Sequence, residues 1–330
     1  MQFFHFHGNE PRNFSNRLDS QDPDFRCRVK SLFGNFSESS GPISIDLSYN
    51  PELGDSGVAE ILVGVTNLQR LILKSCGVSM LEISLPLSLE ELDLTGNHLG
   101  FKGGIALANF LNRSLSLRIL RISDCDLPFD AWAAILHVAY KLTDLEICNP
   151  RMPPESGGQA VYHLCRLVEG NRNLRYLSVG KSCLRDEDIE ELVRSIIRGG
   201  SIEHLDVSGN LISFRGVVEL AKLVALDNFQ ILNIAYNNFG RCGDQIGLQS
   251  LSDSLKERGR EMQKLDVRGN SLKGKALVDF VKTCEETNVN ELLCFANDWT
   301  EDDRSQVFVS RLNTDFYKDG NNLVYKNAGS

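Results

Sequence analysis

One hydrophobic pattern recurs through nearly the whole chain and constrains its fold more than any other feature. Apolar residues follow the spacing L-x-x-L-x-L, and Asn or Cys and then a further apolar residue come after them. In the clearest copy, SLEELDLTGNHL, these positions include Leu92, Leu94 and Asn97. Ten copies are recognisable, with Asn or its equivalent at positions 50, 76, 97, 125, 150, 182, 210, 237, 270 and 297. The nine intervals from position 50 to position 297 average about 27 residues.

The pattern has a direct physical interpretation. L-x-L predicts a short strand whose alternate side chains face the core. A buried turn after the strand leaves backbone groups unpaired, and a carboxamide can satisfy them because it both donates and accepts. Cys76 and Cys125 are small substitutes with a weak donor, so we interpret them as packing residues and not as nucleophiles. Pro150 and Ser182 depart from the rule, and we expect irregular turns there.

Between the strands the hydrophobic period becomes helical. GDSGVAEILVGV, DEDIEELVRSIIRGG, RGVVELAKLVAL and GKALVDFVKTCEE carry apolar residues at three- and four-residue steps, which predicts helices. Repeats of 20–29 residues with this strand pattern are the signature of leucine-rich repeats. The chain resembles the ribonuclease-inhibitor-like class, which includes the Ran GTPase activators, the repeat domains of NOD-like receptors, the CARMIL actin regulators and the tropomodulins. The resemblance implies an α/β fold, a right-handed solenoid or horseshoe of about ten repeats, with parallel strands on the concave face and helices on the convex face.

The repeats divide the chain into three parts. Residues 1–42 are expected to form an N-terminal segment with a helical cap, because Phe25, Val29, Leu32 and Phe33 share one helical face. Residues 43–299 form the solenoid, and residues 300–330 a C-terminal cap. The sequence around Asp319-Gly320 predicts a β-hairpin in that cap. The alternative is that residues 300–330 tail away or belong to a larger assembly.

Composition narrows the class of partner. The net charge is -9 and the pI about 5.3, whereas nucleic-acid-binding domains usually have a basic balance. No stretch approaches the roughly 18 consecutive apolar residues of a membrane helix, so we expect no membrane insertion. The nine cysteines are odd in number and lack short even spacings. They indicate reduced thiols in the cytoplasm, with the nucleus as the alternative.

A search for catalytic and metal-binding motifs predicts neither an enzyme nor a cofactor or metal site. The chain has no G-x-x-x-x-G-K-[ST] loop and no H-E-x-x-H. The glycine-rich stretch from Gly100 to Gly104 lies in a strand-to-helix turn of the repeat. His5 and His7 have no further metal ligands nearby in the sequence. Trp132 and Trp299 fall at core or capping positions, where we expect packing.

The residues between the inward leucines form the predicted binding surface. Their central column contains five carboxylates among ten positions, and basic and aromatic residues flank it. The candidate partner-binding residues are Asp93, Arg121, Glu146, Tyr176, His204, Asp206, Lys264, Asp266 and Arg268. One hypothesis is a docking face for a basic segment of a partner. The other is that L-D-L is simply common in this repeat class and suits an exposed strand.

These features predict a non-catalytic scaffold that binds a protein partner through the concave face. The acidic column favours a partner with a basic segment. The alternative is a regulator of another enzyme, such as a small-GTPase activator of the Ran-activator type. That class commonly carries a long acidic tail, which is absent here. Following GTP loss after adding the chain to small GTPases discriminates between the two. Because Asp206 and Asp266 are expected to point away from the core, replacing both with Lys should weaken partner binding and leave folding intact.

Overall fold

The computed structural model describes residues 2–5, 21, 23–24, 42–63, 65, 67–80, 85–153, 157–241, 243–287, 289–298, 300–303, 316–319 and 322–326. They belong to two compact units, residues 1–153 and residues 154–330, which are described separately. The helical cap predicted from Phe25 to Phe33 and the packing predicted for Trp299 lie outside the described residues. No helix within the described residues is long and apolar enough to cross a membrane.

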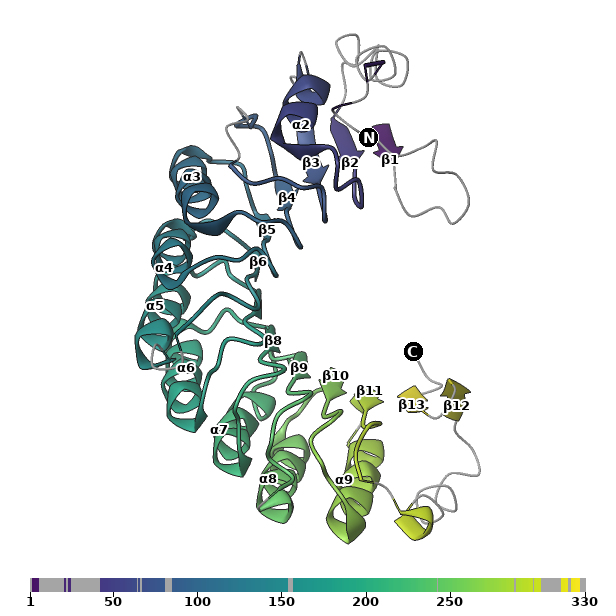
Figure 1. Ribbon diagram of the computed structural model, residues 1–330. Coiled ribbons are helices and arrows are strands. Elements are labelled where there is room, and N and C mark those ends of the chain that lie inside the picture. The colour runs from purple at the N-terminus through teal and green to yellow at the C-terminus, as the bar shows by residue number, and fades with distance from the viewer. Residues whose placement is uncertain are drawn as a thin grey trace. The chain divides into compact units, whose positions relative to one another are not determined.

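Unit 1 is a parallel sheet covered by helices on one side (Figure 1). Its strands are β1 (Gln2–His5), β2 (Ile43–Asp46), β3 (Leu68–Ile72), β4 (Glu91–Asp93), β5 (Ile119–Arg121) and β6 (Asp144–Glu146), each paired in parallel with the next. Its helices are α2 (Gly54–Leu62), α3 (Gly100–Arg113) and α4 (Phe129–Val138). The sequence did not predict β1, because QFFH lies outside the repeat pattern.

Unit 2 has the same architecture, but an antiparallel pair of strands follows its last parallel strand. The parallel strands are β7 (Tyr176–Ser178), β8 (His204–Asp206), β9 (Ile231–Asn233), β10 (Met262–Asp266) and β11 (Val289–Leu293). The helices are α5 (Gly157–Gly170), α6 (Asp186–Gly199), α7 (Phe214–Val224), α8 (Asp244–Glu257) and α9 (Gly274–Glu286). The strands β12 (Phe316–Asp319) and β13 (Asn322–Lys326) form an antiparallel pair, and β13 pairs antiparallel with β11. Each of the ten predicted repeats therefore contributes one strand, β2 to β11.

The core lies between strands and helices and is built from the repeating leucines. In unit 1, Leu71, Leu92, Leu120 and Leu145 are fully buried, and so is Trp132. In unit 2, Leu205 and its equivalents in the neighbouring strands are buried in the same way. Burying one such leucine contributes about 1.5–3 kcal/mol. The alternation of buried and polar positions along each strand therefore fixes which side of the sheet meets the helices.

In five repeats an asparagine side chain forms hydrogen bonds with the preceding repeat. Asn97 Nδ2 donates to the carbonyls of Leu73 and Leu94, both at 2.7 Å. Asn97 Oδ1 accepts from the backbone N–H groups of Cys76, at 2.9 Å, and Val78, at 3.0 Å. The predicted role of the carboxamide in the turn is confirmed, since its donor and its acceptor both serve backbone groups.

The same arrangement recurs in unit 2, where four asparagines reach back to the preceding repeat. They are Asn210, Asn237, Asn270 and Asn297. In unit 1 two cysteines replace the carboxamide, and each donates its thiol to a carbonyl of the preceding repeat. The Sγ atom of Cys76 lies 2.9 Å from Leu47 O and that of Cys125 lies 3.1 Å from Leu94 O. We call the ten equivalent positions the ladder; they are 50, 76, 97, 125, 150, 182, 210, 237, 270 and 297.

The residue just before each ladder position has a left-handed backbone conformation. Glycine occupies this place at Gly96, Gly209 and Gly269, and other residues do so at Tyr49, Ser75, Asp124, Asn149, Lys181, Tyr236 and Ala296. The φ angles of Asn149 and Lys181 are 56° and 52°. The turns at Pro150 and Ser182 thus share the conformation of the others, and the expectation of irregular turns there is wrong in this respect.

Candidate functional site on the strand faces

In each unit the side of the sheet that faces away from the helices is called the strand face. The register of the strands brings the predicted binding residues together on it in two groups. Asp93, Arg121 and Glu146 occupy matching positions of β4, β5 and β6 in unit 1. The other six belong to unit 2, and they are Tyr176, His204, Asp206, Lys264, Asp266 and Arg268.

A network of ion pairs covers the strand face of unit 1. Glu91 Oε2 lies 2.5 Å from Arg70 Nε, and Glu91 Oε1 lies 2.6 Å from Arg121 Nη1. Arg121 Nε lies 3.9 Å from Glu146 Oε2. Burial by itself raises the pKa of Glu91, but the hydrogen bonds and charges of Arg70 and Arg121 outweigh burial and lower it. Sequence reasoning missed Glu91, although its place directly before Leu92 puts it in register with Arg70.

Asp93 shows why aspartate recurs in the central column. Only 1% of its surface is exposed, its Oδ2 lies 3.2 Å from Lys74 Nζ, and its Oδ1 accepts from Thr95 N at 3.0 Å. The bond to the backbone N–H two residues ahead is repeated at other positions of the column. They are Asp46, Asp206, Asn233 and Asp266. A side-chain acceptor at this place caps the start of the turn.

Asp266 and Arg268 form a second fixed pair, in unit 2. Arg268 Nη2 lies 2.6 Å from Asp266 Oδ2, and Arg268 Nε donates to Asp266 Oδ1 at 2.8 Å. The guanidinium carbon lies 4.9 Å from the ring centroid of Phe295 and 5.9 Å from that of Tyr236. The hydrogen bonds that Arg268 donates to Asp266 raise the pKa of Arg268. Since Asp266 is 1% exposed, the expectation that it can become lysine without effect on folding is wrong.

The remaining polar side chains of this face are less buried. The rings of Tyr176 and His204 meet edge to face, with centroids 6.2 Å apart and an interplanar angle of 90°. Asp206 is partly exposed and accepts from Ser208 N at 2.8 Å. Lys264 Nζ lies 3.2 Å from Glu291 Oε1. This face therefore carries aromatic, acidic and basic groups held in defined positions.

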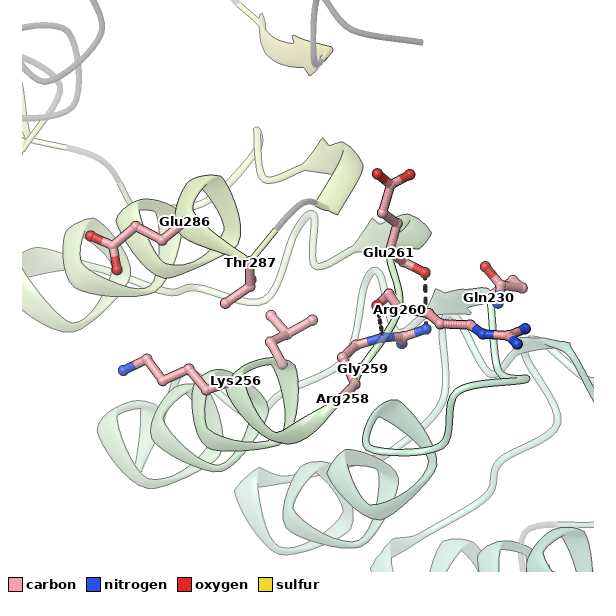
Figure 2. Close-up of a pocket in the computed structure, with 9 residues that line it drawn as sticks. Gln230, Lys256, Arg258, Gly259, Arg260, Glu261, Glu286 and Thr287 are labelled. Carbon is pink, nitrogen blue, oxygen red and sulfur yellow. Dashed lines mark hydrogen bonds between the residues drawn. The ribbon is translucent and has the colours of Figure 1, made fainter.

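A hollow of about 730 Å³ lies elsewhere in unit 2, at the C-terminal ends of α8 and α9 (Figure 2). Its buried polar group is Arg258, which was not predicted. The guanidinium donates to four carbonyl oxygens at 2.7–3.0 Å, those of Val224, Phe229, Arg260 and Glu261. Burial lowers the pKa of Arg258. The guanidinium thus satisfies carbonyl groups at the end of α7 and in the loops before β9 and β10.

The sequence predicts that the ladder cysteines Cys76 and Cys125 are packing residues and not nucleophiles, and their buried surroundings favour packing. Burial raises the pKa of the Cys76 thiol and of the Cys125 thiol to about 12, so both are protonated donors at neutral pH. Among the described residues, no group of three or more His, Cys, Asp or Glu side chains is arranged to hold a metal ion.

Known proteins share this architecture. A family model described as "Leucine Rich repeat" matches residues 87–108. The chain has a leucine-rich-repeat fold. Within that class it is similar to the ribonuclease-inhibitor-like superfamily. It is 26% identical over 213 residues to the ribonuclease inhibitor of Sus scrofa, covering 59% of the chain and 45% of that protein.

Three other similar proteins have lower sequence identity to this chain. The ribonuclease inhibitor of Mus musculus is 23% identical over 78% of the chain and 59% of its own length. The chain thus spans about half the length of these relatives. Protein CARMIL of Dictyostelium discoideum is 25% identical over 50% of the chain and 16% of its own length. The solved structure of the yeast Rad7 and Elc1 complex matches with a TM-score of 0.54 at 17% identity, covering 76% of the chain and 61% of the matched chain, which shows the fold.

Proposed function

We propose that the chain is a non-catalytic scaffold that binds a protein partner through its strand faces. The observation that carries this proposal is the fixed arrangement of Arg268 between the rings of Tyr236 and Phe295, with Asp266 holding its guanidinium. Tyrosine and arginine are the residue types that most often dominate binding energy at protein interfaces. Side chains held in place before binding lose less entropy when a partner arrives, so this face is suited to recognition.

The similar proteins support a binding role. The ribonuclease inhibitors are named for acting on a ribonuclease, and Rad7 forms a complex with Elc1. The charge of this chain, -9, favours a protein partner with a basic segment over a nucleic acid. The cytoplasmic or nuclear location stays a prediction.

Site-specific photo-crosslinking tests which face binds. A benzoylphenylalanine replaces Lys264 on the strand face of unit 2 in one variant and Lys222 on α7 in the control. Both lysines form ion pairs within the chain, at 3.2 Å and 2.6 Å, so each variant loses a similar contact. In extract of the source cells we expect discrete adducts from position 264 and none from position 222. Adducts from position 222 alone would assign binding to the helices and contradict the proposal.

A further inference from the structure

We propose that Asp206, together with the rings of His204 and Tyr176, forms a socket for one lysine or arginine side chain of the partner. This inference rests on the proposed function and names the chemistry of one contact within it. It starts from the pairing of carboxylates on the two strand faces.

Three of the four other carboxylates in the central column pair with a cation of the chain. Asp93 is paired with Lys74 at 3.2 Å, Glu146 with Arg121 at 3.9 Å and Asp266 with Arg268 at 2.6 Å. The carboxylate of Asp206 accepts from Ser208 N, and no lysine, arginine or histidine nitrogen of the described residues lies within 4.0 Å of it. Asp206 thus differs from these three.

The repeat geometry explains the difference. Arg121 pairs with Glu146 from the column position of the preceding repeat, where Asp206 has the uncharged Ser178. In the other two pairs the cation lies two residues beyond a column position, either in the same repeat or in the preceding one. Arg268 follows Asp266 by two residues, and Lys74 follows Ile72, which is in register with Asp93. The equivalent positions for Asp206 are Ser208 in its own repeat and Gly180 in the repeat before. Neither side chain carries a charge, so the chain itself supplies no cation at these two places.

Two cations of the same strand face, Arg268 and Lys264, pair with other carboxylates. The charge of Asp206 contributes to the raised pKa of Arg268, but the guanidinium hydrogen bonds of Arg268 go to Asp266. Lys264 pairs with Glu291. An external cation is therefore the group that completes the environment of Asp206.

The aromatic pair beside Asp206 suits the rest of such a side chain. His204 precedes Asp206 by two residues on β8 and so lies on the same side of the sheet. Tyr176 is in register with His204 and meets it edge to face. Aromatic faces attract ammonium and guanidinium groups, and the apolar stem of lysine or arginine packs along rings while its charge reaches a carboxylate. Charge complementarity thus selects a basic side chain.

The test uses the full chain and small probes of known chemistry. N-acetyl-arginine amide and N-acetyl-lysine amide are titrated into protein with carbon-13-labelled His and Tyr rings. N-acetyl-citrulline amide, which has nearly the shape of arginine and no charge, is the neutral control. We expect saturable shifts of the His204 and Tyr176 ring signals with both cationic amides and none with citrulline. Absence of these shifts up to the solubility limit, or equal shifts with citrulline, overturns the proposal.

The matched variant is Asp206→Asn. Asn233, in register with Asp206 on β9, accepts from Ala235 N at 3.0 Å, so asparagine keeps the turn at this column position and removes only the charge. We expect Asp206→Asn to weaken binding of the arginine amide tenfold or more. Asp253→Asn on α8, the control for net charge, should leave binding unchanged. Equal binding by the wild type and Asp206→Asn rules out the socket.

A second variant does not depend on removing Asp206. Ser208→Arg places arginine where Arg268 stands two repeats later, and this arginine should pair with Asp206 and fill the socket from within. We expect binding of the amides to be lost while the thermal unfolding midpoint stays the same or rises. If photo-crosslinks form at position 264 but neither variant affects amide binding, the socket is wrong and the proposed function stands. If the variants abolish amide binding but partners crosslink only to the helices, the socket stands and the proposed function is wrong.

Discussion

At the scale of single residues, the left-handed position before each ladder residue stands out because so many side chains occupy it. Left-handed backbone costs a residue other than glycine roughly 1–2 kcal/mol. Seven of the ten positions nevertheless carry such residues, Ala296 and Tyr236 among them. The hydrogen bonds of the ladder therefore fix the conformation of the turn, and the residue in it tolerates the strain.

Replacing Ala296 with glycine should stabilise the chain. Ala296 has a φ of 55° and is exposed, so glycine relieves strain and removes no buried contact. Because glycine also loses more backbone entropy on folding, we expect a net gain of only about 0.5–1 kcal/mol, measured by chemical denaturation. The opposite change, Gly269→Ala, should destabilise, since a Cβ there would lie 2.4 Å from Tyr236 Cδ1. A loss of stability in Ala296→Gly would show that the turn is not strained.

The cysteines should differ in reactivity in the folded chain. Cys183 is exposed, whereas burial raises the pKa of Cys76, Cys125 and Cys294 to about 12. Alkylation at mildly alkaline pH should therefore modify Cys183 first and reach these three only after unfolding, as peptide mass analysis would reveal. The sequence predicts nine free thiols in denaturant without reductant, and the seven cysteines described by the structure form no disulfide bond. A clearly lower count would contradict the reduced compartment.

At the scale of strands and helices, the strand face of unit 1 joins charges from successive repeats. Glu91 receives hydrogen bonds from Arg70 of the preceding strand and Arg121 of the following strand. Its pKa is lowered, so in the folded chain it stays ionised to a more acidic pH than in the unfolded chain. This stabilisation is present above the unfolded pKa and is lost as the pH falls through the folded pKa.

Glu91→Gln should lower the free energy of unfolding by about 1.5–3 kcal/mol at neutral pH, since hydrogen bonds to charged groups are lost. The difference from the wild type should shrink as the pH falls below the ordinary glutamate value of 4.5. Glu190→Gln is the control, because the ion pair of Glu190 with Arg194 is exposed on α6 and such pairs contribute little. A difference that is independent of pH would assign the effect of Glu91 to packing and not to charge.

These elements also show how far the sequence alone reaches. The ten strands follow from L-x-L, and the role of Asn97 follows from the hydrogen-bonding capacity of a carboxamide, because both depend on residues within one repeat. The ion pair of Asp93 with Lys74 depends on residues that register brings from neighbouring repeats, and so does the lack of an ion pair at Asp206 within the described part of the chain. The hydrogen bond that Ser208 N donates to Asp206 needs backbone geometry that the sequence pattern does not specify. The sequence therefore predicts the central column of carboxylates, but it does not predict which of these carboxylates are buried or which cations they pair with.

At the scale of the whole molecule, a repeat chain gains most of its stability from contacts between neighbours. Leu205 lies in the core of unit 2 and is 1% exposed. Leu205→Ala should open a cavity and cost about 2–5 kcal/mol. Hydrogen exchange should then accelerate most in β7, β8 and β9 and least in β2, β3 and β4, which belong to the other unit. Uniform acceleration throughout both units would mean that the chain unfolds as a single cooperative body.

The direction of the ladder has a consequence for synthesis on the ribosome. Five asparagines accept hydrogen bonds from the turn of the preceding repeat: Asn97 from the turn at Cys76, for example, and Asn297 from the turn at Asn270. Each of these five turns therefore lacks its acceptor until the asparagine of the next repeat has emerged, about 27 residues later on average. At roughly 5–20 residues per second, that delay is about one to five seconds for each repeat. We expect the nascent chain to fold one repeat behind its own growing end.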